Sequence, residues 1–125
     1  MPATFQVYRF SDDEHYWWRL VSPHGRGVAR MPRGARSVQA VRDAVRDVVA
    51  GLDELTPVLR LTDTYRWQWS LHAPGGIPVA RGIGDQDRRV RCEQACRTFV
   101  AMAAAAAVDG SVATFRRVGA PSRPG

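Results

Sequence analysis

The sequence predicts an α+β fold built from two tandem β-β-β-α repeats, and two observations support this prediction. First, a shift of 51 positions places residues 7–50 on residues 58–101 without a gap, and fourteen of the 44 aligned pairs are identical. Second, each copy contains short alternating apolar segments followed by one segment with helical spacing. Two copies of a period near 50 residues indicate a duplicated supersecondary unit rather than a long solenoid. We therefore expect a single domain over 1–125, with repeats at 4–52 and 57–108.

Three short strands are expected at the start of each repeat, because aromatic and β-branched residues are concentrated there. Turn-forming Ser, Asp, Pro and Gly residues separate these segments. The strands predicted in the first repeat are Phe5–Phe10, Tyr16–Val21 and Gly27–Met31, and those in the second are Val58–Thr62, Arg66–His72 and Ile77–Gly82.

A helix is expected after each group of strands. Ser37 is a suitable N-cap for the first helix. Valine and leucine recur behind it at helical spacing, and charged residues fill the opposite side. The second helix is predicted from about Asp87 to Val108, where an alanine-rich run favours helix and Asp109-Gly110 ends it.

The central strands predict how the two repeats assemble. Trp18 and Leu20 alternate along one strand, and Trp69 and Leu71 along its counterpart, so each pair points to one face. The simplest arrangement is one six-stranded antiparallel sheet with pseudo-twofold symmetry and both helices on the Trp18/Trp69 face. The opposite face would then be open to water or to a partner. The extension at 111–125 contains a segment whose alternation permits an added edge strand, and a loose end is expected over 119–125.

The combination of Trp18-Arg19-Leu20 with Gly25, repeated as Trp69-Ser70-Leu71 with Gly76, resembles the YegP-like family of bacterial and archaeal proteins. The resemblance implies two three-strand-plus-helix units that share one sheet, with each helix packed across onto the other unit. It also implies a monomer, because two copies satisfy within one chain the pairing that single-copy chains make as dimers, although a homodimer stays open. The family has no established activity, so the resemblance supplies no catalytic residues.

The composition suggests an affinity for polyanions but does not prove one. The formal net charge is +6 and the sequence pI is about 10.6. All 18 basic residues are arginine, and Lys and Asn are absent, which a GC-rich genome would also produce. No secretory signal or membrane-length apolar run is visible, and two cysteines are typical of a reducing compartment. We expect a cytoplasmic protein without membrane contact.

Catalytic, metal and cofactor sites are not predicted. Cys92 and Cys96 align with Val41 and Val45, which are core positions, so the pair is best explained as structural. A thiol-based redox role is a distant alternative. The three histidines have no partners at metal-ligand spacing.

The predicted open face supplies the leading candidate site, which consists of Trp17, Arg19, Arg66, Gln68 and His72. Aromatic and arginine side chains on a bare antiparallel sheet are typical of single-stranded nucleic-acid recognition. The leading hypothesis is a small non-catalytic binding or interaction domain with an unknown partner. The alternative is a nucleic-acid-binding module that uses this basic face.

Overall fold

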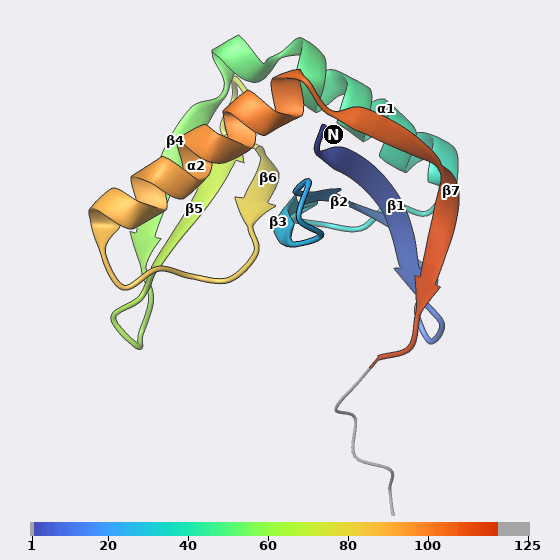
Figure 1. Cartoon of the computed structure of the whole chain (residues 1–125), viewed down its shortest axis with the longest axis horizontal. Coiled ribbons are helices and arrows are strands. Elements are labelled where there is room, and N and C mark those ends of the chain that lie inside the picture. The colour runs from blue at the N-terminus through green and yellow to red at the C-terminus, as the bar shows by residue number, and fades with distance from the viewer. Residues whose placement is uncertain (1, 118–125) are drawn as a thin grey trace, which may run out of the picture.

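The order of secondary-structure elements repeats along the chain, and one further strand follows the second copy (Figure 1). The computed structural model describes residues 2–117. The first copy contains β1 (Thr4–Phe10), β2 (Trp17–Val21), β3 (Gly27–Arg30) and α1 (Val38–Ala50), followed by a short 3-10 helix, η1 (Leu52–Glu54). The second contains β4 (Thr56–Leu61), β5 (Trp67–His72), β6 (Pro78–Gly82) and α2 (Arg89–Ala104), and the added strand is β7 (Ala107–Phe115).

The strands form one sheet in the order β4-β5-β6-β3-β2-β1-β7. The expectation of six antiparallel strands is therefore wrong: the sheet has seven strands and is mixed, because β7 pairs parallel to β1. The prediction also carried α2 to Val108, whereas the helix ends at Ala104 and β7 begins at Ala107. β7 forms because the outer edge of β1 presents backbone N–H and C=O groups that a further strand can pair with. The alanine-rich segment alone does not reveal this pairing. The loose end expected over 119–125 lies outside the described residues.

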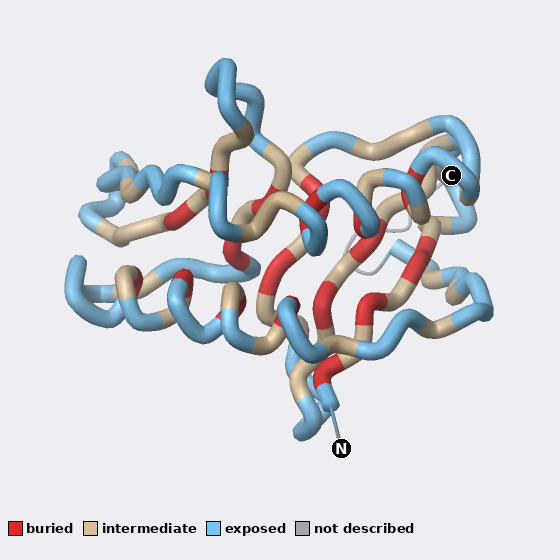
Figure 2. Tube along the Cα trace, turned by 90° about the horizontal axis from the view of Figure 1, so that it is seen from above, coloured by how far each residue is buried: buried red, intermediate tan, exposed pale blue. Residues whose placement is uncertain are grey.

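Alternating side chains on five strands join both helices in one hydrophobic core. Trp18 and Trp69 lie near its centre, where Phe99 of α2 stacks on Trp18 with ring centroids 6.2 Å apart and lies 5.3 Å from Trp69. In Figure 2 the buried segments gather in the middle of the molecule, while the loops around them are exposed. The strand and helix residues of this core are Phe5, Val7, Trp18, Leu20, Ala29, Trp69, Leu71 and Ala80 with Val41, Val45, Val48, Cys92, Cys96, Phe99 and Ala103.

Each helix lies mainly over the strands of its own repeat. α1 contacts β1 and β2 and reaches β6, while α2 contacts β4 and β5 and reaches β3. The exchange of helices implied by the family resemblance is thus partial: α1 reaches β6 of the other repeat, and α2 reaches β3 and stacks Phe99 on Trp18 of β2. Ser37 is the N-cap of α1, and its hydroxyl accepts a hydrogen bond from the Ala40 amide at 3.1 Å.

The pairing register corrects the gap-free alignment of the two repeats. Val7 pairs with Trp18 in the first hairpin, whereas Leu59 pairs with Trp69 in the second, so the first hairpin is one residue longer. Val58, which the alignment matched to Val7, pairs with Ser70 on the other face. One residue of slip inverts the faces of a strand, so the repeats correspond by 52 positions in the first strand and by 51 thereafter.

Candidate functional site

Three arginines stand in a row across the sheet face opposite the hydrophobic core, which we call the open face. Arg19 of β2 pairs directly with Arg30 of β3, and Arg30 pairs directly with Arg81 of β6. Ser70 of β5 continues the row beyond Arg81. Neighbouring strands lie about 4.8 Å apart, so this arginine row (Arg19, Arg30 and Arg81) spans about 10 Å of the sheet. Arg30 and Arg81 are equivalent residues of the two repeats, so they flank the pseudo-twofold axis.

The arginine row is not neutralised within the described chain. None of the ion pairs found among residues 2–117 involves Arg19, Arg30 or Arg81. Burial lowers the pKa of the Arg81 guanidinium, and the positive charges of Arg30 and Arg60 add to this effect. Like charges directly opposite each other destabilise a sheet. An anionic group placed between these side chains would reduce this repulsion.

Aromatic rings extend the open face toward the β7 edge. Tyr8 lies 5.7 Å from Phe10 and 5.8 Å from Phe115, measured between ring centroids. The Arg19 guanidinium lies 4.9 Å from the centre of the Phe115 ring, within cation–π range, and Nε of Arg19 donates to Gln6 at 2.7 Å. Burial raises the pKa of the Tyr8 hydroxyl. This aromatic cluster was not predicted, since Phe115 enters it only through the parallel pairing of β7.

Of the predicted site residues, Arg19 belongs to the arginine row and Trp17 lies beside it. Trp17 was expected as an exposed aromatic, but it is half-buried. Its ring packs so closely against Gly34 that a Cβ there would lie 2.8 Å from Trp17 Cε2. The Arg30 guanidinium lies 5.7 Å from the centre of the Trp17 ring. Trp17 therefore supports the row from beneath and offers little free surface for stacking.

Arg66 stands apart from the other predicted residues. Its Nε donates to the carboxylate of Asp85, in the loop between β6 and α2, at 2.9 Å. Its charge is thus already paired, and it joins the β5 end to that loop. A positional pattern could not reveal this, because Asp85 is 19 residues away in sequence.

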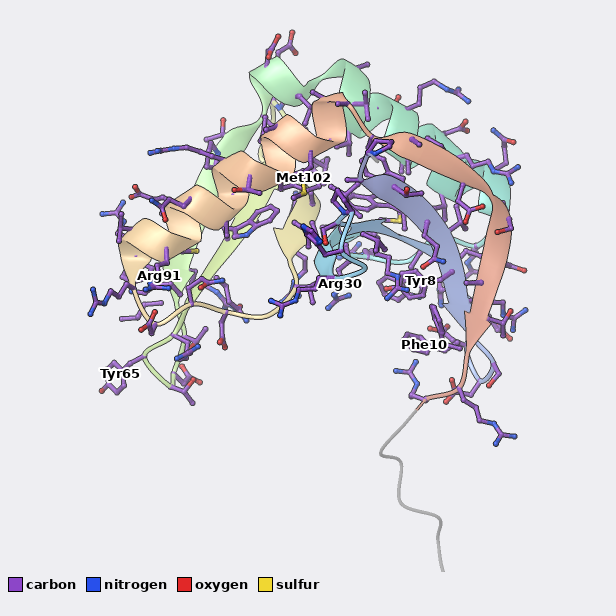
Figure 3. The ribbon with its side chains drawn as sticks, viewed as in Figure 1. Tyr8, Phe10, Arg30, Tyr65, Arg91 and Met102 are labelled. Carbon is purple, nitrogen blue, oxygen red and sulfur yellow. The ribbon has the colours of Figure 1, made fainter. Side chains whose placement is uncertain are left out.

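Gln68 and His72 line a hollow of about 310 Å³ on the β5 side of the open face. Both imidazole nitrogens are occupied: Nδ1 lies 3.0 Å from the Gly76 carbonyl and Nε2 lies 2.9 Å from the Ser70 hydroxyl. The carbonyl can only accept, so His72 holds the following turn rather than acting as a free base. Other residues lining the hollow are Pro32, Val58, Arg60, Trp69, Ser70, Pro78 and Arg81. The sequence left the face of Arg30 and Arg81 undecided, and the strand pairing places both on the open face. Arg30 and Tyr8 are labelled in Figure 3.

The two cysteines lie in the core and not at the open face. Cys92 is fully buried, and Cys96 is 3% exposed. Burial is the main cause that raises the pKa of the Cys96 thiol to about 11, with a smaller contribution from Cys92. A thiol with such a pKa is protonated at neutral pH, which disfavours nucleophilic chemistry.

Within residues 2–117, no three histidine, cysteine or acidic side chains gather as a metal site requires. No helix in the same part of the chain is long and apolar enough to cross a bilayer.

Comparison with solved structures identifies the fold. No protein-family model matches the chain, and no curated protein matches it by sequence. The solution NMR structure of the E. coli protein yegP, described as of unknown function, superposes with a TM-score of 0.70 and 12% sequence identity, over 90% of this chain and 95% of that one. A UPF0339 protein from Shewanella oneidensis gives a TM-score of 0.68 and 6% identity, over 91% of this chain and 92% of that one. The resemblance to the YegP-like family is confirmed at the level of the fold.

Proposed function

We propose that this chain is a small non-catalytic binding domain whose open face binds single-stranded nucleic acid. The observation that carries the proposal is the arginine row, in which three adjacent cross-strand positions hold uncompensated positive charge. Such an arrangement is unfavourable in the free protein and favourable with phosphates in place. The solved structures of the same fold are of uncharacterised proteins and do not decide the ligand.

The placement of the helices makes the open face available. Buried residues of α1 and α2 share one core with Trp18 and Trp69, whose side chains leave the sheet on the opposite side from the arginine row. The face that carries the row is therefore free of helices in the described chain. At the other end of the row, a hollow lined by Gln68, His72 and Arg81 adds polar side chains beside the positive charges.

The proposal is tested by fluorescence anisotropy with labelled single strands of DNA and RNA that are about twelve nucleotides long. We expect binding whose affinity falls as salt rises, because phosphate contacts release counterions, with a slope of about −0.7 per phosphate. The double variant Arg30→Gln/Arg81→Gln should bind at least tenfold more weakly and show a shallower salt slope. Binding that does not depend on salt, or that is absent at low salt, would refute the proposal.

A matched control separates the arginine row from net charge. Arg46 and Arg97 are equivalent positions on the exposed sides of α1 and α2, and their side chains are 70% and 78% exposed. The variant Arg46→Gln/Arg97→Gln changes the charge by the same amount on other elements. If both double variants lose affinity equally, the protein attracts nucleic acid only through its overall charge, and the open face is not the site.

Two further expectations accompany this proposal. The buried cysteines disfavour the redox alternative, so we propose no thiol chemistry. We propose that the domain is a monomer, since the two repeats already share one core. We also propose that it acts in the cytoplasm.

A further inference from the structure

Tyr65 has a backbone conformation that its side chain disfavours. It lies in the turn between β4 and β5 with φ +60°, and it is the only residue other than glycine with positive φ within 2–117. The left-handed region costs an ordinary residue free energy, and a bulky residue there is an outlier that invites a functional explanation.

The turn between β2 and β3 shows what this position normally holds. In that turn the Ser22 amide donates to the Arg26 carbonyl at 2.7 Å and the Gly25 amide donates to the Ser22 carbonyl at 2.9 Å. The turn that carries Tyr65 makes the same two bonds, from Thr62 to Arg66 at 2.7 Å and from Tyr65 to Thr62 at 2.9 Å. Three-residue turns of this type favour glycine at the left-handed position, where Gly25 has φ +85°.

Nothing in the fold requires the tyrosine ring at this position. Tyr65 is 79% exposed, and among residues 2–117 it is the only aromatic residue in the exposed class. Figure 3 shows it at the tip of the β4–β5 hairpin, at the lower edge of the molecule and away from α1. The same hairpin carries Arg60 and Gln68 of the open face, joined by a hydrogen bond of 3.0 Å.

We propose that Tyr65 is a base-stacking residue for the single-stranded nucleic acid that the arginine row binds by its phosphates. This inference rests on the proposed function. Every base has a π face, so a free aromatic ring stacks on any sequence and complements the phosphate contacts. Trp17 and the aromatic cluster are half-buried or buried, which leaves Tyr65 as the ring that can accept a base. The strain in the turn is then a cost retained for binding.

The test compares Tyr65→Gly, Tyr65→Phe and the wild type in thermal unfolding and in oligonucleotide binding. Tyr65→Gly should raise the melting temperature, because the turn gains the residue it favours, and should weaken single-strand binding about tenfold. Its salt slope should stay unchanged, since no phosphate contact is lost. Tyr65→Phe should bind like the wild type, and binding to a duplex should not respond to Tyr65→Gly because paired bases are already stacked.

The outcomes separate this inference from the proposed function. If the wild type binds single strands with a steep salt slope and Tyr65→Gly binds equally well, the stacking role is refuted and the arginine row stands. If the wild type binds no nucleic acid, both are refuted. A variant that is more stable but binds single strands more weakly, with an unchanged salt slope, supports the stacking role.

Discussion

The two repeats are alike beneath the helices and different on the open face. Trp18 and Trp69 are both buried at equivalent positions, as are Leu20 and Leu71. On the open face, Arg19 of the first repeat corresponds to Ser70 of the second. Tyr8, Trp17 and Gln6 of the first repeat likewise correspond to Arg60, Gln68 and Val58 of the second.

This contrast teaches which positions the fold itself constrains. Core positions must stay apolar in both halves, since a buried polar group without a partner is costly. Open-face positions carry no such requirement, so the halves are free to differ there. One half carries rings and an arginine and the other a polar hollow, while the central charged pair, Arg30 and Arg81, is the same in both. A ligand that lies across both halves would therefore meet two different surfaces joined by one symmetric pair of charges.

The largest expected effect is the loss of stability on removing either of the two equivalent core tryptophans. Trp18 is 0% exposed and Trp69 is 5% exposed, and both contact Phe99. Trp18→Ala and Trp69→Ala should each lower the free energy of unfolding by about 3–5 kcal/mol, measured by urea denaturation. A near-neutral effect in one half alone would show that the repeats do not share the core equally.

Much of this fold could be predicted from the sequence, because the informative patterns are local. The alternation of Trp18 with Leu20 fixed a strand and its buried face, and the valine spacing located α1. β7 could not be assigned as a parallel strand, since its partner β1 lies about 100 residues away and its first residues continue an alanine run. The extra residue in the first hairpin was hidden because Val7 and Val58 match by chance.

The candidate site was harder to predict than the fold. β3 and β6 have four and five residues, and the register shifts between each of them and its neighbour, so parity alone could not place Arg30 and Arg81. Pairing across the two repeats decides their face. Of the predicted residues, Arg19 joins the arginine row, whereas Arg66 is held by Asp85.

A smaller effect is expected where the two cores differ, at Cys96 and its counterpart Val45. The unfolded thiol titrates near 9, and burial raises the pKa of Cys96 in the folded state to about 11. The thiolate therefore favours unfolding. The free energy of unfolding keeps the full contribution of the buried thiol below pH 9 and loses it as the pH rises toward 11. Cys96→Val should remove on the order of 1–2 kcal/mol of the alkaline loss, measured as unfolding free energy from pH 8 to 11. Identical pH profiles would contradict this explanation of the site.

The smallest expected effect comes from making the two open faces alike. Ser70→Arg would extend the arginine row from three positions to four, because Ser70 pairs directly with Arg81. We expect about threefold tighter binding to a single strand at low salt and a salt slope that is steeper by about 0.7.

The reciprocal change, Arg19→Ser, gives the first repeat the residue that the second carries, and it should weaken binding and flatten the slope by a similar amount. The Arg19 guanidinium also lies over the Phe115 ring, so Arg19→Ser should slightly lower the free energy of unfolding. Ser70→Arg removes no such contact and therefore tests the added charge alone. If Ser70→Arg changes neither the affinity nor the slope while Arg19→Ser weakens binding, the ligand stays on the first-repeat half. The hollow beside Arg81 then lies outside the binding path.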